Sequence, residues 1–253
     1  MIIAADNITS TNPRVAEALR SLHPAPIKEI AKRAEESGAG LIDLNPGPLS
    51  ERKRDRMAFL VETVREVTDR RVILDSPDPA VIEAGLSSCR DAPIISAVTL
   101  EPKKLAAMFS LAAESGADLV ALLLDETGFS PPDSDGKMAV AVDIAARADK
   151  AGLPPERIIF DPVIPNISWP DAFERLSACS SAIRQMSSGA LMGTPCRTMA
   201  GISNLLSGFR RAYPRSLERT CLSVMIGAGL SISLMDAFDS DLAEEASQAG
   251  KMI

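Results

Sequence analysis

The segment Arg71–Pro79, with the sequence RVILDSPDP, decides the fold that we predict for this chain. Its apolar run Val72–Leu74 ends directly at Asp75. Short runs of this kind are typical of strands that are buried on both faces of a parallel sheet. Asp78 followed by Pro79 is typical of a helix start, because Asp caps the N-terminus and proline fits the first turn. The segment therefore predicts an acidic side chain where a buried strand meets the following helix.

The same order of strand, polar junction and helix repeats along the chain. The predicted strands are Ile2–Ala5, Leu41–Leu44, Val72–Leu74, Ile94–Ala97, Leu119–Leu124, Ile158–Phe160, Arg197–Ile202 and Ser231–Met235. The predicted helices include Pro13–Leu22, Ile27–Ser37, Val81–Cys89, Lys103–Ser115, Lys137–Lys150, Pro170–Met186, Pro214–Gly227 and Leu242–Ala249. Regular alternation over this length predicts a (β/α)₈ TIM barrel in which residues 1–253 form one domain. An open doubly wound sheet is the alternative, and it is disfavoured because no strand precedes a Gly-x-Gly-x-x-Gly motif.

Composition narrows the classes of function. The net charge of −7 argues against a nucleic-acid or anionic-membrane partner. The four cysteines are scattered and His23 is the only histidine, so we expect this chain to hold no metal. The residues after Met1 do not resemble a signal peptide, and no apolar run reaches about 18 residues. Scattered thiols fit a reducing compartment, so we expect a cytoplasmic protein with no membrane association.

Parallel strands in a barrel all end at one mouth, where ligands bind. The residues expected there are short carboxylates, amides and hydroxyls: Asp6, Asn7, Asp43, Asn45, Asp75, Ser96, Asp125, Asp161, Asn204 and Asp236. Lys, Arg and His are nearly absent from these positions, which disfavours an anionic reacting group. Carboxylates and amides suit a polar heterocycle with many N–H donors. Helix capping is an equal alternative for each single residue, and we expect at least three of them to face a ligand.

Three neighbouring features have two interpretations each. Asp133, in the loop 127–136, is interpreted as part of an Asx turn rather than of a lid. The arginines at positions 210, 211 and 215 are interpreted as solvated charges rather than as contacts to an anionic substrate tail. Trp169 and Phe173 either line the mouth or pack elsewhere, and packing is at least as well supported.

Several strand-end segments resemble the methyltetrahydrofolate:corrinoid protein methyltransferases. This family belongs to the pterin-binding barrels, which also include dihydropteroate synthase. The matching segments, in the same order over nearly the whole chain, are Pro24–Pro26 (PAP), Leu41–Pro48 (LIDLNPGP), Leu74–Ser76 (LDS), Asp133–Asp135 (DSD), Phe160–Pro162 (FDP) and Gly201–Asn204 (GISN). The chain departs from the family at Ala5–Thr9, where a Gly-Glu-Arg-Ile-Asn-like motif is usual. It also has Ser96 in place of an amide and Asp125 in place of Asn.

The resemblance implies transfer of the N5-methyl group between methyltetrahydrofolate and the cobalt of a corrinoid (cobalamin). The corrinoid is carried by a partner corrinoid protein, and the methyltransferase is a homodimer acting in one-carbon metabolism. Asp75 and Asp161 would hydrogen-bond the amino-pyrimidine edge of the pterin, and Asn204 would stabilise positive charge at N5. Asn204 and Asp161 are therefore the expected catalytic residues. The expected substrate-binding residues are Asp43, Asn45, Asp75, Ser96, Asp125, Asp161, Gly201, Ser203, Asn204 and Asp236.

Two other interpretations of the same residues remain open. The altered strand-one segment and Ser96 are compatible with a barrel that binds pterins without catalysis. The second interpretation is that the chain is another small-molecule enzyme on the same scaffold, because a fold does not fix a function. Dihydropteroate synthase is one such pterin enzyme, but it fits less well. It needs a lysine near the end of strand seven and basic residues for pyrophosphate, and Gly201–Asn204 has none.

Overall fold

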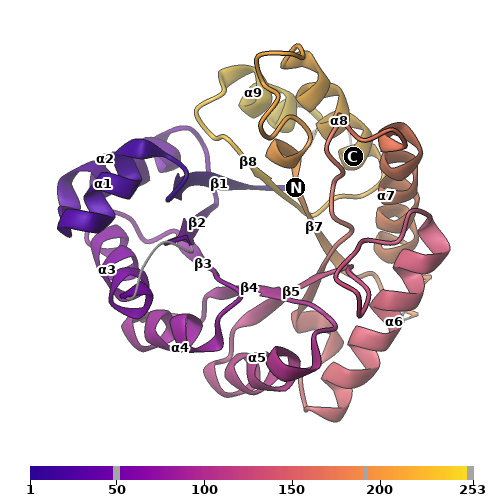
Figure 1. Cartoon of the computed structure of the whole chain (residues 1–253), viewed down its shortest axis with the longest axis horizontal. Helices are drawn as coiled ribbons and strands as arrows, with labels where there is room; N and C mark the ends of the chain where they lie inside the picture. Colours follow the sequence, from indigo (N-terminus) through magenta and orange to yellow (C-terminus); the bar gives the residue numbers. More distant parts are fainter. Residues whose placement is uncertain (48–51, 191–192, 250–253) are drawn as a thin grey trace.

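Eight parallel strands close into a barrel in chain order, with β1 pairing with both β2 and β8 (Figure 1). This computed structural model describes residues 1–47, 52–190 and 193–249, so Pro48 of the segment Leu41–Pro48 lies outside it. The strands are β1 Ile2–Thr9, β2 Leu41–Asn45, β3 Arg71–Asp75, β4 Ile94–Val98, β5 Asp118–Leu122, β6 Ile158–Asp161, β7 Arg197–Gly201 and β8 Ile232–Met235. The predicted (β/α)₈ TIM barrel is thereby confirmed.

The helices surround the barrel and cover its outer face (Figure 1). They are α1 Pro13–Ser21, α2 Pro24–Glu36, α3 Lys53–Arg65, α4 Pro79–Ser88, α5 Pro102–Ser115, α6 Ser134–Lys150, α7 Ala172–Ser187, α8 Ser216–Gly227 and α9 Ser240–Ala249, with 3₁₀ turns at Pro155–Arg157 and Ile202–Asn204. Asp78 caps α4 as predicted, accepting a 3.0 Å hydrogen bond from the Ala80 amide. Within the described ranges, no helix has the length and apolar character needed to cross a bilayer.

Helix α2 begins earlier than the sequence pattern predicts. We expected Pro24–Pro26 to interrupt the chain before a helix from Ile27, but Pro24 is the first helical residue. Amides in the first turn of a helix have no partner within the helix, so prolines there cost no hydrogen bond. His23 precedes the helix as its N-cap and makes no side-chain cap.

The lumen of the barrel changes from apolar to polar along the strands. One residue from each strand packs into an apolar cluster there: Ala4, Leu41, Ile73, Ile94, Val120, Ile159, Met199 and Ile232. Side chains alternate between the two faces of a strand, so the residue two positions farther on also faces the lumen. In chain order those residues are Asp6, Asp43, Asp75, Ser96, Leu122, Asp161, Gly201 and Leu234. The strand sequences therefore place polar side chains in the lumen towards the mouth.

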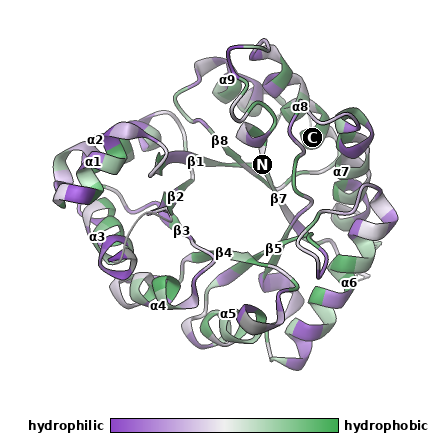
Figure 2. Cartoon of the chain, in the orientation of Figure 1, coloured by the Kyte–Doolittle hydropathy of each residue, from purple (hydrophilic) through white to green (hydrophobic). Residues whose placement is uncertain are grey.

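The main hydrophobic core lies between the strands and the helices. Residues on the outer face of the strands, such as Ile42 and Leu44 of β2, join one large cluster with apolar faces of the helices. A second cluster holds α7, α8 and the end of β8 together. Figure 2 shows hydrophobic residues concentrated in the strands and the hydrophilic residues more often on the outer sides of the helices. Packing on both faces fixes the strands that carry the polar residues of the lumen.

An ion-pair network lies at the opposite end of the barrel from the mouth. Asp118, at the start of β5, accepts hydrogen bonds from Arg71 at 2.7 Å and from Arg197 at 2.9 Å. These three residues are the first residues of β5, β3 and β7. Interactions at this face stabilise a TIM barrel, whereas chemistry takes place at the other face. We therefore assign Asp118 a role in stability.

Candidate functional site

A β-bulge in β1 places two polar residues at the seam where the barrel closes. The register runs from Ala5 opposite Ile42 to Ile8 opposite Leu44, so Asp6 and Asn7 together oppose one residue of β2. A bulge of this kind bends a strand and redirects its side chains. The sequence led us to expect a strand that ends at Ala5, yet pairing continues to Thr9.

Asn7 joins the first strand to the last. Its amide nitrogen donates a 2.7 Å hydrogen bond to Asp236, and its amide oxygen accepts from the Ala237 backbone at 3.1 Å. Asp6 lies beside Asp43, Asp236 and the Ser203 hydroxyl, which donates a hydrogen bond to it. Burial raises the pKa of Asp6, and the nearby Asp236 carboxylate adds to that rise. The bulge thus contributes one carboxyl to the mouth and uses one amide to fix Asp236.

Three side chains from β2 and β3 form a connected acidic group. Asn45 donates a 2.6 Å hydrogen bond to Asp75 and accepts one of 2.8 Å from the Gly47 amide. Burial raises the pKa of Asp75 to about 6, although the Asn45 hydrogen bond acts in the opposite direction. Asp43 is only 3% exposed. Its burial, together with the charges of Asp75 and Asp6, raises the pKa of Asp43 well above its usual value.

Asp161 and Ser96 complete the polar part of the lumen. Asp161, at the end of β6, is 5% exposed and accepts a 2.7 Å hydrogen bond from the Val163 amide. Burial raises the pKa of Asp161 to about 7. Ser96 on β4 is buried and pairs in register with Asp75 on β3. The group therefore offers carboxylate acceptors and one hydroxyl within a space that excludes most water.

The end of β7 places an amide above this group. Gly201 ends the strand, and a Cβ at that position would lie 2.9 Å from the Asn204 amide nitrogen. A side chain at position 201 would therefore displace the Asn204 amide from its place beside the strand. The Asn204 side chain is exposed at the mouth, and within the ranges that the structure describes it makes no hydrogen bond. It is therefore available to a ligand.

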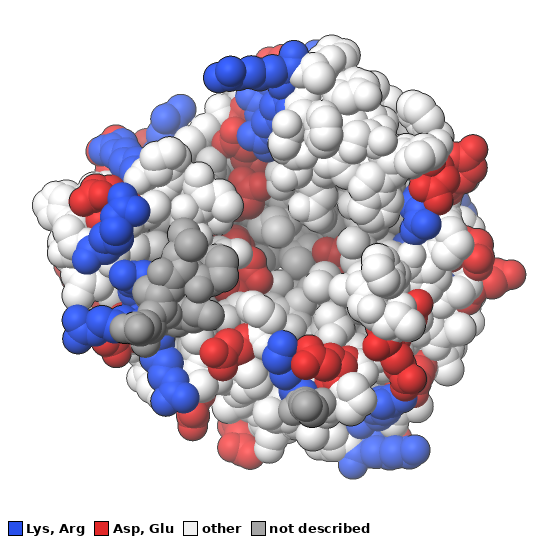
Figure 3. Space-filling model, in the orientation of Figure 1, with Lys and Arg blue, Asp and Glu red and all other residues white. Residues whose placement is uncertain are grey.

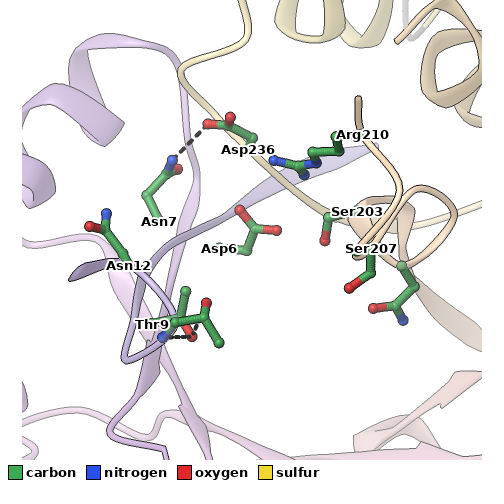
Figure 4. A pocket seen from close by; sticks show the side chains of 11 residues that line it. Asp6, Asn7, Thr9, Asn12, Ser203, Ser207, Arg210 and Asp236 are labelled. Atoms are coloured by element: carbon green, nitrogen blue, oxygen red, sulfur yellow. Dashed lines mark hydrogen bonds between the residues drawn. The ribbon is translucent and has the colours of Figure 1, made fainter. Parts of the chain in front are cut away.

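A pocket of about 410 Å³ opens beside the lumen, between β1, β7 and β8. Its lining is almost entirely polar: Asp6, Asn7, Thr9, Thr11, Asn12, Ser203, Asn204, Ser207, Gly208, Arg210 and Asp236. Arg210 is the one cation among these described residues, and its guanidinium points towards Asp6 and Asp236 (Figure 4). Figure 3 shows acidic side chains around the central hollow, with most basic side chains towards the periphery. The pocket thus extends the acidic lumen towards the rim.

Most of the residues assigned from the sequence come together at the mouth. Asp43, Asn45 and Asp75 form one connected group, and Ser203, Asn204 and Asp236 line the pocket. Ser96 lies in the middle of β4, and Asp161 and Gly201 are the last residues of β6 and β7.

Asp125 lies apart from these residues. We expected its strand to run to Leu124, but β5 ends at Leu122 and Asp125 belongs to the following loop. One oxygen of its carboxylate accepts from the amides of Thr127 at 2.8 Å and Phe129 at 3.2 Å. Hydrogen bonding to Thr127 lowers the pKa of Asp125, as expected for a carboxylate that is held in a turn. A role for Asp125 in substrate binding therefore rests on the sequence alone.

Eight of the eleven described residues that line the pocket were not assigned as substrate-binding from the sequence, among them Asp6, Asn7, Asn12 and Arg210. Asp6 and Asn7 were expected at the mouth as strand-end residues, but nothing local to the sequence indicates the bulge that carries them. Asn12 lines the pocket and also caps α1, accepting a 3.0 Å hydrogen bond from the Arg14 amide. Arg210 was interpreted as a solvated charge, and only the folded loop after β7 directs it into the pocket.

Other groups at the mouth have structural roles. Asp133 caps α6 by accepting a 2.7 Å hydrogen bond from the Gly136 amide, in keeping with its interpretation as a turn residue. Among the described residues, no group of three or more His, Cys, Asp or Glu side chains is arranged to hold a metal ion.

These features define a (β/α)₈ barrel whose mouth is lined by carboxylates and amides. The chain belongs to the pterin binding enzyme family, whose model matches residues 9–233. The match confirms, at the level of the family, the resemblance found in the sequence. A methylcorrinoid:tetrahydrofolate methyltransferase from Eubacterium limosum is 24% identical over 245 residues, covering 96% of this chain and 87% of that protein.

Solved structures of dihydropteroate synthases share the fold. The enzyme from Thermus thermophilus gives a TM-score of 0.67 at 20% identity, covering 89% of this chain and 88% of that chain. The 7,8-dihydropteroate synthase from Vibrio fischeri gives a TM-score of 0.68 at 15% identity, covering 99% of this chain and 92% of that chain. At these identities the likeness shows a common fold.

Proposed function

We propose that this protein transfers a methyl group between N5 of tetrahydrofolate and the cobalt of a corrinoid carried by a partner protein. One observation carries the proposal. The mouth of a pterin-family barrel holds the acceptors Asp75 and Asp161 in its lumen and the unengaged amide of Asn204 at the rim. The relative from Eubacterium limosum, which is named for this reaction, supports it over 96% of the chain.

The two carboxylates are suited to the amino-pyrimidine edge of a pterin. That edge presents ring N–H and amino donors, and an ionised carboxylate accepts two such hydrogen bonds. Asp161 uses one oxygen for the Val163 amide, and Asp75 uses one for Asn45, so each has a second oxygen free. Leu122 and Leu234 occupy the corresponding lumen positions on β5 and β8 and offer apolar contact to the ring. This arrangement orients the heterocycle in one plane.

The reaction itself needs control of charge at N5. In the direction towards cobalt, Co(I) gives its electron pair to the methyl carbon, and the carbon–nitrogen bond breaks with its pair retained by N5. The proton that N5 received beforehand stays on it, so the product is tetrahydrofolate. In the reverse direction the N5 lone pair attacks the methyl carbon, the cobalt–carbon pair returns to cobalt, and N5 then loses a proton. The amide oxygen of Asn204, which lies at the rim beside Gly201, would stabilise the positive charge at N5.

A dihydropteroate synthase activity is less well supported. Such an enzyme must bind pyrophosphate, which requires clustered cations. Arg210 is the one cation among the described residues that line the pocket, and it is paired with the buried carboxylate of Glu218 at 3.6 Å. The segment Gly201–Asn204 adds no lysine. The balance of charge at the mouth therefore favours a substrate whose reacting part is not an anion.

An anaerobic assay tests the proposal directly. Purified protein is mixed with methyltetrahydrofolate and free cob(I)alamin, and the loss of Co(I) absorbance is followed. We expect methylcobalamin to form, with a purified corrinoid protein as the alternative acceptor. Binding of methyltetrahydrofolate without transfer to either acceptor would instead establish a non-catalytic pterin-binding barrel. Failure to bind any reduced pterin would reject the assignment of the mouth as a pterin site.

We also propose that two copies pair through α7 and α8, which leaves the mouth open to the corrinoid protein. A largely apolar groove of about 330 Å³ runs between these helices, and the described residues that line it carry no charge. Phe173 projects from its edge with 71% exposure, and Val224 is 49% exposed. A projecting ring beside a groove on the same face can pair with itself about a two-fold axis. Light scattering should give twice the mass of the chain, and Phe173→Asp should halve it.

A further inference from the structure

A buried lysine lies directly behind the turn that follows β6. Lys137, in the first turn of α6, is 1% exposed. Its ammonium donates a 2.7 Å hydrogen bond to the Pro162 carbonyl and a 2.5 Å hydrogen bond to the Ser130 hydroxyl. The Ser130 hydroxyl and the Cys179 thiol also donate to this carbonyl, at 3.3 Å and 3.6 Å. Three side chains from separate elements therefore converge on one backbone oxygen.

That carbonyl belongs to the peptide group that contacts Asp161. The oxygen of this group is on Pro162 and its N–H is on Val163, and the N–H donates a 2.7 Å hydrogen bond to the Asp161 carboxylate. Lys137 and Asp161 thus bind opposite ends of a single amide. A cation at the oxygen of an amide polarises it and strengthens donation from its N–H, since hydrogen bonds in a chain reinforce one another. The backbone of Val163, in this turn, adopts the left-handed conformation, with φ of 63°.

We propose that Lys137 is a positioning residue of the pterin site, whose charge acts through the Pro162–Val163 peptide group to keep the Asp161 carboxylate ionised and oriented. The proposal rests on the function proposed above, because it concerns how Asp161 accepts a pterin.

Burying Lys137 near the start of α6 reduces the stability of the fold unless its charge makes a favourable interaction. Burying an ammonium is unfavourable, and a cation near a helix N-terminus opposes the helix dipole. The charged or titratable groups that act on Lys137 are Cys179, Asp161, Arg175 and Asp133. Burial lowers the pKa of Lys137, while Cys179 and Asp161 oppose that change. Reciprocally, Lys137 lowers the pKa of Asp161 against the larger effect of burial.

Ionisation of Asp161 matters because a pterin edge presents two donors. A carboxylate accepts both, whereas a protonated carboxyl gives up one acceptor position to its own proton. With a pKa of about 7, Asp161 is near half-ionised at neutral pH. A small change in that pKa therefore alters pterin binding in the physiological range. Removing the positive charge of Lys137 should raise the pKa of Asp161, so that full ionisation is reached only at higher pH.

The first experiment measures the ionisation of Asp161 without any ligand. Protein labelled with ¹³C at the aspartate carboxyl carbons is titrated, and the Asp161 signal is identified by its loss in Asp161→Asn. In Lys137→Met we expect the Asp161 midpoint to move up by about one pH unit, the size usual for removal of one nearby opposite charge. Lys150→Met, on the exposed last turn of α6, is the matched control and should leave the midpoint in place. An unchanged midpoint in Lys137→Met would overturn the proposal.

The second experiment measures methyltetrahydrofolate binding from pH 6 to pH 9. Lys137→Met should bind on the order of fivefold more weakly at pH 7, with the difference closing towards pH 9 as Asp161 ionises in both proteins. Weakening by the same factor at every pH would show a merely structural role and reject the proposal. If Lys137→Met does not fold, Lys137→Gln replaces it, because it keeps a donor for the Pro162 carbonyl but no charge. A wild-type protein that binds no pterin at any pH would reject the proposed function itself, before any variant is compared.

Discussion

The Asn45 side-chain amide donates a 2.6 Å hydrogen bond to the Asp75 carboxylate, across the ends of two neighbouring strands. The Gly47 amide holds the other end of the Asn45 side chain at 2.8 Å. Asn45 therefore acts on Asp75 as the Val163 amide acts on Asp161, by fixing one oxygen and leaving the second free. Both proposed pterin acceptors are thus oriented by the protein before a ligand arrives, which reduces the entropy lost on binding.

Replacing Asn45 by Ala should make pterin binding more sensitive to pH. The Asn45 hydrogen bond lowers the pKa of Asp75, which burial has raised to about 6. Without that bond the pKa of Asp75 rises further, so the carboxylate protonates at a higher pH. Titration calorimetry should show binding that weakens roughly fivefold at pH 6.5 and recovers above pH 8. Gln248→Ala, on the exposed face of α9, is the control, and identical pH profiles for Asn45→Ala and wild type would contradict this prediction.

Replacing Asn204 by Ala should lower turnover far more than affinity. The amide is expected to act on charge that develops at N5 in the transition state, so kcat should fall about 100-fold while KM for methyltetrahydrofolate changes little. Gly201→Ala should give a smaller loss of the same kind, because its Cβ would lie 2.9 Å from the Asn204 amide nitrogen. Steady-state methyl transfer measures both variants. Wild-type kcat in Asn204→Ala would show that the assigned role is wrong.

Replacing Asp161 by Asn should stabilise the ligand-free protein at alkaline pH. The folded-state pKa of Asp161 is about 7, against an ordinary value of 3.8, so the folded protein holds a proton that the unfolded chain has released between these values. Its contribution to stability is complete at low pH and is lost as the pH rises through about 7. Asp161→Asn removes this loss. At pH 8 its free energy of unfolding, measured by urea titration, should therefore exceed that of the wild type by roughly 1–3 kcal/mol. The two proteins should converge near pH 4, and a difference independent of pH would contradict the assignment.

Replacing Asp118 by Asn should destabilise the protein at neutral pH, whereas Asp161→Asn should stabilise it at alkaline pH. Burial alone would raise the pKa of Asp118, but hydrogen bonds from Arg197 and Arg71 outweigh it and lower the pKa below 3.8. The stabilisation is therefore present above about pH 4 and is lost as the pH falls through the lowered pKa. At pH 7 the variant should lose about 2 kcal/mol, the usual size for hydrogen bonds to charged groups. Urea unfolding compares it with Asp149→Asn, an exposed position on α6, which should unfold like wild type.

The two acids affect stability in opposite directions at the two ends of the barrel. Asp118 lies among cations at the face where the strands begin, and its charge stabilises the fold. Asp161 lies in the lumen near the mouth, where its burial costs stability. Sites that need a charge held away from water commonly reduce stability in this way.

The sequence by itself determined the barrel and the chemical character of its mouth. Most strands contain a short apolar run such as Val72–Leu74, and several helix starts carry a local signal such as Asp78 followed by Pro79. These signals depend on neighbouring residues only, so they can be recognised without the fold. Alternation along the strands then places Asp43, Asp75 and the other polar residues in one lumen.

Only the tertiary structure decided which of these residues act on one another. Asn7 and Asp236 are separated by 229 positions, and they meet because β1 and β8 close the barrel. The bulge that redirects Asp6 depends on the pairing of β1 with β2, and Lys137 reaches Pro162 only because α6 packs against the end of β6. Contacts of this kind arise from strand register and packing between distant segments, which no local pattern encodes.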